Sequence, residues 1–227
     1  MRTFHRSISP AFTLIELLVV IAIIAILAGM ILPAISLAKG RTQTIKCLNQ
    51  LKQMGIATAM YTDEQNDRLP GSQHNLPSWL YSLAKYNGTN IYLCPLDGNS
   101  GVNVPRPYSY AVNDFLTPHP AGAPQLNFSK ASSVPDDTAT LWMGEMQGDI
   151  LGQDHFHFAD FRNSPEPTNP AGGYSTNGFR GQVEDTRHSG AANYLFLDGH
   201  VNTIKPAAIP FLLTNIGSKF ILPSGRR

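Results

Sequence analysis

An uninterrupted apolar run near the N-terminus constrains this chain more than any other feature. Residues 17–32 are all Leu, Val, Ile, Ala, Gly or Met, and the 21 residues from Phe12 to Leu32 carry a single ionisable side chain, Glu16. At a rise of about 1.5 Å per residue, a helix of this length spans about 30 Å, the thickness of the hydrocarbon core of a bilayer. We therefore predict a membrane helix over residues 12–32.

Glu16 is unexpected inside such a helix. A carboxylate at that depth costs roughly 2.5 kcal/mol or more, so an intramembrane ionisable residue by default has a function and a partner. The alternative is that Glu16 lies near the helix end and only reaches out to the interface. Arg2, His5 and Arg6 precede the run, and a basic segment of this kind stays cytoplasmic by the positive-inside tendency. The rest of the chain is then expected across the membrane.

A secretory signal peptide is the alternative interpretation of the N-terminus. Arg2 and Arg6 would form its basic region, and residues 36–38, Ser-Leu-Ala, would supply a small-residue cleavage site. The apolar run is longer than the ~7–15 residues of such peptides and includes an acidic side chain. Both observations favour the membrane helix, whereas a signal peptide would give a soluble product.

Residues 11–27 resemble the N-terminus of type IV pilins and of the pseudopilins of type II secretion systems. In that family a prepilin peptidase cuts before the Phe and methylates the new amine, which implies a leader over residues 1–11 and cleavage between Ala11 and Phe12. The family usually has Gly before the cut, and Ala11 is small enough for the same pocket. The resemblance implies that Glu16 neutralises the Phe12 amine of a neighbouring subunit during assembly. A pair with the Phe12 amine of the same chain is the local alternative.

The helix is expected to continue to residue 66, with a kink near Pro33, because proline removes a backbone donor and clashes with the preceding turn. Past Pro33 apolar residues recur at helical spacing on one face, which predicts contact with a globular domain. This head is expected over residues 67–227, where Gly and Pro are frequent and residues 148–181 are the least regular part. The resemblance implies an α+β, pilin-like fold, with the long helix packed on an antiparallel β-sheet and long irregular loops.

The clearest signal in the head is Asp198-Gly199 between two alternating apolar runs, which predicts a β-hairpin with a type I′ turn. Together with His188, these residues are similar to the His-X9-Asp-Gly signature of a pilin-like family of unknown function. We favour the interpretation in which His188 hydrogen-bonds the hairpin backbone and Asp198 serves its turn. The alternative is that the side chains of His188, Asp198 and His200 converge on one spot.

Cys47 and Cys94 are the two cysteines of the chain. Both lie in the region expected outside the cytoplasm, where disulfides persist. One bridge between them would tie the long helix to a following loop. Two unpaired buried thiols are the equally open alternative.

Metal-binding candidates in the head are weak. His155 and His157 would share one face of a strand and could be metal ligands with Asp154 or Asp160. An edge strand with a solvated polar face explains the same alternation, and we favour it. Residues 97–99, Asp-Gly-Asn, resemble part of a calcium loop but match no complete site. We therefore expect no cofactor, with Ca²⁺ as the single candidate.

The function predicted from these features is structural. The sequence contains no Gly-x-Ser-x-Gly motif and no phosphate loop, so we expect no enzyme. A net charge of +1 without a basic cluster among aromatic residues indicates no nucleic-acid partner. We predict a subunit of a type II secretion pseudopilus or type IV pilus-like filament. It is expected to cross the bacterial inner membrane once, with a cytoplasmic N-terminus and a periplasmic or extracellular head. The alternative is a membrane-anchored or secreted module that binds a polysaccharide or another surface ligand.

Overall fold

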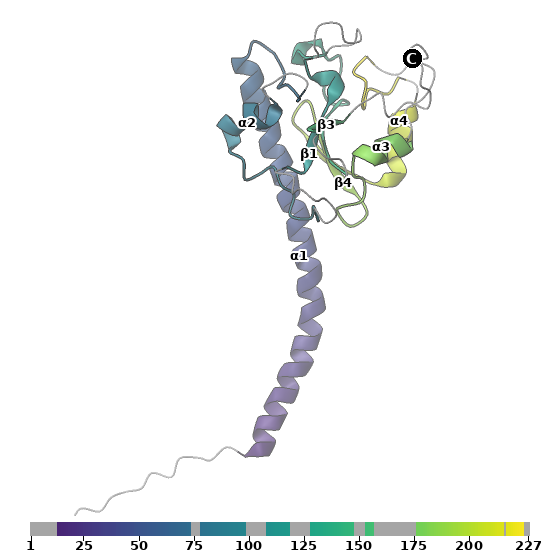
Figure 1. Ribbon diagram of the computed structural model, residues 1–227. Coiled ribbons are helices and arrows are strands. Elements are labelled where there is room, and N and C mark those ends of the chain that lie inside the picture. The colour runs from purple at the N-terminus through teal and green to yellow at the C-terminus, as the bar shows by residue number, and fades with distance from the viewer. Residues whose placement is uncertain are drawn as a thin grey trace, which may run out of the picture. The chain divides into compact units, whose positions relative to one another are not determined.

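The computed structural model describes residues 13–73, 78–98, 108–118, 128–147, 153–156, 176–215 and 217–224. The chain divides into two compact units, residues 1–42 and residues 43–227, which we call the N-terminal and C-terminal units. Helix α1 (Leu14–Glu64) belongs to both (Figure 1).

The N-terminal unit is described from residue 13 onward and consists of the first part of α1. The helix passes through Pro33 without interruption. From residue 13 to residue 39 every side chain is exposed, and the helix is long and apolar enough to cross a membrane. At its other end α1 stops at Glu64, inside the predicted range of 12–66, because Asn66 and Asp67 adopt left-handed backbone conformations with φ of 53° and 69°.

A five-stranded sheet forms the centre of the C-terminal unit, with the strand order β3-β1-β2-β4-β5. The pairs β1–β2, β2–β4 and β4–β5 are antiparallel, as predicted. The pair β1–β3 is parallel, so the sheet is mixed, with the antiparallel pairing that was predicted at its other three junctions. A strand of two residues has too few positions for its sequence to indicate its direction. The strands are β1 (Tyr110–Asn113), β2 (Leu141–Glu145), β3 (His155–Phe156), β4 (Ala192–Phe196) and β5 (Val201–Ile204).

Helix α1 packs on this sheet through its second part. Leu51 and Met54 are fully buried in the core, and the indole nitrogen of Trp142 in β2 donates a hydrogen bond of 3.0 Å to the hydroxyl of Thr58. At Gly55 a Cβ atom would lie 3.0 Å from Leu195 Cδ1 in β4, so glycine permits the close approach. The predicted α+β, pilin-like architecture, in which a long helix packs on a β-sheet, is therefore confirmed.

In the described part of the C-terminal unit, three shorter α-helices accompany the sheet: α2 (Trp79–Asn87), α3 (Thr176–Gln182) and α4 (Ile209–Thr214). Helix α3 begins inside the segment that was expected to be irregular through residue 181. Its sequence contains two glycines and an asparagine, which are poor helix formers. Tertiary contacts support it instead, because Phe179 is fully buried with its ring centroid 6.4 Å from that of Tyr194 and 6.1 Å from that of Phe220.

Candidate functional site: the N-terminal segment and the buried motif

Glu16 is part of a capping box at the start of α1. Its Oε2 accepts hydrogen bonds from the Thr13 backbone N–H at 2.9 Å and from the Thr13 hydroxyl at 2.8 Å. In return the Glu16 backbone N–H donates to Thr13 Oγ1 at 3.2 Å. This reciprocal pair is typical of Thr-x-x-Glu at a helix N-terminus. Ala11 and Phe12, the residues that flank the predicted cut, lie outside the described residues.

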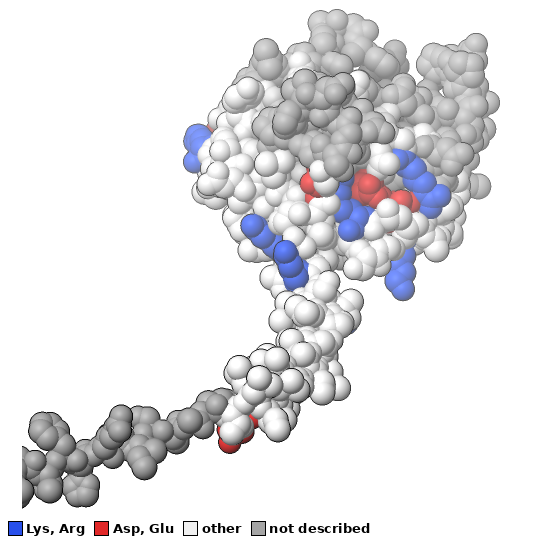
Figure 2. All heavy atoms as spheres, turned by 60° about the horizontal axis from the view of Figure 1, so that its bottom comes forward, with Lys and Arg blue, Asp and Glu red and all other residues white. Residues whose placement is uncertain are grey.

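The surface of α1 beyond this cap is almost uncharged. Figure 2 shows an acidic group at the start of the helix, followed by a long stretch of residues that are neither acidic nor basic. The large apolar side chains here are 46–78% exposed from Leu14 to Leu32. A soluble domain rarely leaves so large a contiguous apolar surface in water. The segment therefore requires lipid or other protein around it.

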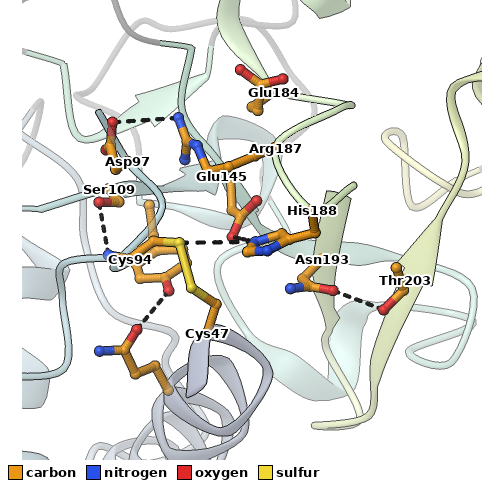
Figure 3. Close-up of polar contacts among 12 residues, drawn as sticks. Cys47, Cys94, Asp97, Ser109, Glu145, Glu184, Arg187, His188, Asn193 and Thr203 are labelled. Atoms are coloured by element: carbon orange, nitrogen blue, oxygen red, sulfur yellow. Dashed lines mark hydrogen bonds and ion pairs between the residues drawn. A yellow bond between two sulfur atoms is a disulfide. The ribbon is translucent and has the colours of Figure 1, made fainter. Parts of the chain in front are cut away.

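Cys47 and Cys94 are joined by a disulfide with a Cα–Cα distance of 5.4 Å, a usual separation for such a bond. The bridge connects α1 to the segment after α2. Cys47 is fully buried and Cys94 is 3% exposed. The hydroxyl of Ser109 accepts a hydrogen bond of 2.9 Å from the backbone N–H of Cys94 (Figure 3), which fixes that side of the bridge.

His188, the first residue of the His-X9-Asp-Gly motif, lies beside this disulfide. Its Nε2 is 2.6 Å from Oε1 of Glu145 in β2 and 3.8 Å from Sγ of Cys94 (Figure 3). The side chains of His188 and Glu145 are both completely buried. Oε2 of Glu145 and Nδ1 of His188 have no hydrogen-bond partner within the described parts of the chain. The His188 ring therefore contacts a strand carboxylate, whereas the backbone N–H of His188 donates a hydrogen bond of 2.7 Å to the carbonyl of Ala191, directly before β4.

Asp198 and Gly199, the other end of the motif, form the turn between β4 and β5, so the predicted hairpin is confirmed. The turn type is different, because Gly199 has a φ of 85° whereas Asp198 has no positive φ. The N–H of Gly199 donates to the carbonyl of Phe196 at 3.0 Å, and the N–H of Phe196 donates to that of His200 at 2.9 Å. A turn followed by a left-handed glycine is the bulged form of hairpin, in which only the glycine needs positive φ.

Asp198 pairs locally with His200, whose Nδ1 is 2.6 Å from the Asp198 carboxylate. His188 has different partners, so the three residues do not share contacts. The two ends of the motif are instead both linked to α1. His188 contacts Sγ of Cys94, which the disulfide joins to Cys47 in α1, while Lys52 Nζ of α1 donates a hydrogen bond of 2.7 Å to the carbonyl of Gly199. The motif therefore attaches β4 and its turn to the helix.

A buried ion pair lies next to His188. Nη2 of Arg187 is 3.5 Å from the Asp97 carboxylate and donates a hydrogen bond of 2.7 Å to the carbonyl of Met146. Asp97 is the first residue of the weak calcium-loop candidate, and Asn99 of that candidate lies outside the described residues. An arginine at the Asp97 carboxylate disfavours a cation there.

His155 is 2% exposed in the edge strand β3, where its Nδ1 lies 2.8 Å from the Asp154 carboxylate. The same carboxylate accepts hydrogen bonds from the hydroxyl of Ser78, the N-cap of α2, and from the backbone N–H of Gln73. The edge strand was predicted correctly, but His155 is buried rather than solvated, next to an Asp154 that accepts hydrogen bonds from Ser78 and Trp79 at the start of α2. His157 and Asp160, the other metal candidates, lie outside the described residues.

Tyr110 in β1 has a buried phenol near Glu145, and its protonation state depends on this environment. Burial raises the pKa of its phenol well above the ordinary value, and the nearby charge of Glu145 raises it further. The hydroxyl therefore stays protonated and donates a hydrogen bond of 3.0 Å to the side-chain oxygen of Gln50 in α1. The sheet thus offers α1 a neutral donor close to the disulfide.

Glu145 is the central residue that the sequence did not single out. It ends the run Leu141–Glu145, whose five residues are all buried. The sequence feature that could have identified it is a lone acidic residue at the end of an apolar strand, because a fully buried carboxylate requires a partner. That partner, His188, is 43 positions away, and local pattern cannot identify it.

Comparison with known proteins matches residues 9–32 to the family model described as the prokaryotic N-terminal methylation motif. The matched residues include Glu16, its capping partner and most of the apolar surface of α1. This match supports a type IV pilin-like prepilin that is a substrate of a prepilin peptidase, anchored by a single apolar helix. No curated protein and no solved structure matches the chain.

Proposed function

We propose that this protein is a structural, non-enzymatic subunit of a filament of the type II secretion pseudopilus or type IV pilus class. It is delivered to the inner membrane with its N-terminus in the cytoplasm, cut between Ala11 and Phe12 and methylated on Phe12. It then assembles through α1 with other pilin-like subunits. The observation that carries the proposal is the methylation motif at residues 9–32, which includes an exposed apolar helix with one carboxylate at its start.

The mechanism follows from the properties of that helix. In the bilayer, lipid covers the apolar side chains that water would not tolerate. In a filament, sister helices cover the same side chains, so a subunit moves between two environments of similar polarity. An apolar surface alone would let neighbouring helices slide along one another. An ion pair between the Glu16 carboxylate and a neighbour's amine forms at one axial position, so it fixes the register of one subunit against the next.

The first test is the N-terminus of the mature protein. Mass spectrometry of the membrane fraction of the native host should find a chain that begins at Phe12 and carries one extra methyl group. A chain that begins at Lys39, or a protein recovered in the soluble fraction, would contradict the proposal and indicate a secreted product.

The second test separates the two roles that Glu16 can have. The Glu16→Gln variant keeps an oxygen acceptor for the capping box but removes the charge, whereas the Thr13→Val variant removes the capping hydroxyl and keeps the charge. If the carboxylate pairs with a neighbour's amine, the Glu16→Gln chain should fail to enter filaments and the Thr13→Val chain should assemble. Assembly of the Glu16→Gln chain at the parent level would show that Glu16 only caps the helix.

A further inference from the structure

We propose that Cys47, Cys94, Glu145 and His188 form a buried Zn²⁺ site when the disulfide between the cysteines is open. One ligand atom from each residue lies within 4.8 Å of the other three. The four side chains reach this point from α1, the segment after α2, β2 and the segment before β4 (Figure 3). This inference does not depend on the filament function.

The donor set fits zinc. Two thiolates, one imidazole and one carboxylate are the ligand types that Zn²⁺ takes in four-coordinate sites. With the usual bond lengths, a tetrahedral site places a sulfur and a nitrogen ligand roughly 3.6 Å apart. The observed distance from Cys94 Sγ to His188 Nε2 is 3.8 Å. Glu145 Oε1, now 2.6 Å from the same nitrogen, would have to move away to roughly 3.4 Å.

An independent observation comes from buried atoms that have no hydrogen bond. The Glu145 and His188 side chains are wholly buried, and each has one polar atom, Oε2 and Nδ1, without a partner among the described residues. Buried polar atoms are nearly always satisfied in native structures, and an exception requires an explanation such as an ion. A cation on the Glu145 carboxylate would explain the unpartnered Oε2, whereas Nδ1 of His188, the ring nitrogen that is not a ligand, would gain no partner from it. The neighbouring Arg187 has a guanidinium nitrogen, Nη1, without a partner in the described parts of the chain, and its charge would offset the net negative charge of two thiolates and a carboxylate around Zn²⁺.

The backbone around the four residues is already fixed. The hydroxyl of Ser109 holds the Cys94 N–H, and the N–H of His188 donates a hydrogen bond of 2.7 Å to the carbonyl of Ala191. The carbonyl of Glu145 accepts a hydrogen bond of 2.8 Å from the N–H of Glu184. The transition from disulfide to metal site therefore requires side-chain movement within a fixed frame.

The chemical step balances as follows. A trialkylphosphine attacks the disulfide, the sulfur–sulfur bond breaks, and water supplies the oxygen of the phosphine oxide and the protons of the two thiols. The disulfide gains the two electrons that the phosphine loses. Zn²⁺ then displaces both thiol protons to solvent, because thiolate is the ligand form of cysteine. The oxidised chain has no thiolate and should lack the site.

The experiment uses the full-length chain in detergent micelles, either oxidised or reduced anaerobically with a trialkylphosphine, and titrates it with Co²⁺ as a spectroscopic probe for zinc. The reduced chain should bind one Co²⁺ per chain, with a thiolate-to-cobalt charge-transfer band and intense tetrahedral d–d bands that added Zn²⁺ removes. The oxidised chain should show neither band. Absence of these bands from the reduced chain, or equal binding by both forms, would overturn the proposal.

Single substitutions test the two non-sulfur ligands. The Glu145→Gln and His188→Gln variants should each weaken Co²⁺ binding by more than the roughly 10–100-fold that follows loss of an outer-shell partner. The matched control is His200→Gln, because His200 forms an exposed carboxylate pair with the same 2.6 Å separation. Unchanged affinity in the His188→Gln variant would refute the ligand set.

Because either variant could misfold, X-ray absorption at the zinc edge of the reduced parent chain gives a reading that needs no substitution. Two sulfur and two nitrogen or oxygen ligands are expected. Sulfur ligands alone, or nitrogen and oxygen ligands alone, would exclude the proposed site.

Discussion

Opening the disulfide should measurably destabilise the C-terminal unit. Cys47 and Cys94 are 47 positions apart and almost completely buried. In the chain-entropy model, cross-linking a loop of this length removes about 4 kcal/mol of conformational freedom from the unfolded state at 25 °C. Residual structure in the unfolded chain reduces the effect. We therefore expect the reduced chain to lose about 2–4 kcal/mol of unfolding free energy.

The assay is urea denaturation of the full-length chain in detergent micelles, with a chelator present so that metal binding does not compensate. Trp79 and Trp142 are the two tryptophans of the chain, both fully buried, so their fluorescence reports exposure of the core. The parent should be measured oxidised and reduced. Reduction isolates the cross-link better than substitution, because it neither creates a cavity nor introduces a hydroxyl.

The control is the double variant Cys47→Ser and Cys94→Ser, which should be at least as unstable as the reduced parent and should not respond to the reductant. A loss below about 0.5 kcal/mol on reduction would refute the reasoning, since that lies far under the loop-closure value. A response of the double variant to the reductant would show that the effect does not come from this bond.

Four further outcomes are expected in the same denaturation assay or by titration. The Gly55→Ala variant should lose about 1 kcal/mol, because overpacking against Leu195 costs about 1–3 kcal/mol and better helix propensity returns about 1 kcal/mol. Gly40→Ala, with nothing within 4 Å of the added Cβ, should not be destabilised. Asn113→Leu should lose about 3 kcal/mol, because it leaves two buried carbonyls and a buried amide without their side-chain partner. Burial raises the pKa of Tyr92 to about 12. Between about pH 10 and pH 12 the folded state therefore keeps the phenol proton that the unfolded state loses. The free energy of unfolding should fall as the pH rises through this range. Tyrosinate absorbance that develops fully near the ordinary phenol pKa, with no unfolding, would contradict this last expectation.

The sequence was most informative where one residue type dominates a long stretch or where a turn has a specific chemical requirement. Sixteen consecutive apolar residues, 17–32, permit few structures other than a helix in an apolar environment. The pair Asp198-Gly199 located the hairpin correctly. Its turn type was wrong because a positive φ at the glycine alone also closes a hairpin, as a bulge.

Long-range pairing was not accessible from the sequence. The partnership of Glu145 with His188 depends on strand order, and the cysteine pair was compatible with either a bridge or two thiols until Cys47 and Cys94 were placed together. The same limit applies to β3, whose parallel direction is set by the path of the chain between strands and not by its two residues. In each case the missing information was the geometry of the fold.

The position of the disulfide has a mechanical consequence. Cys47 is the first buried residue of α1, so tension applied to the N-terminal part of the helix reaches the cross-link before the rest of the core. The load then passes through the sulfur–sulfur bond to Cys94, and the residues between the cysteines carry none of it. At about 3.4 Å per residue, the closed loop withholds roughly 150 Å of chain from extension. Under pulling, the oxidised protein should therefore yield a shorter contour length than the reduced protein.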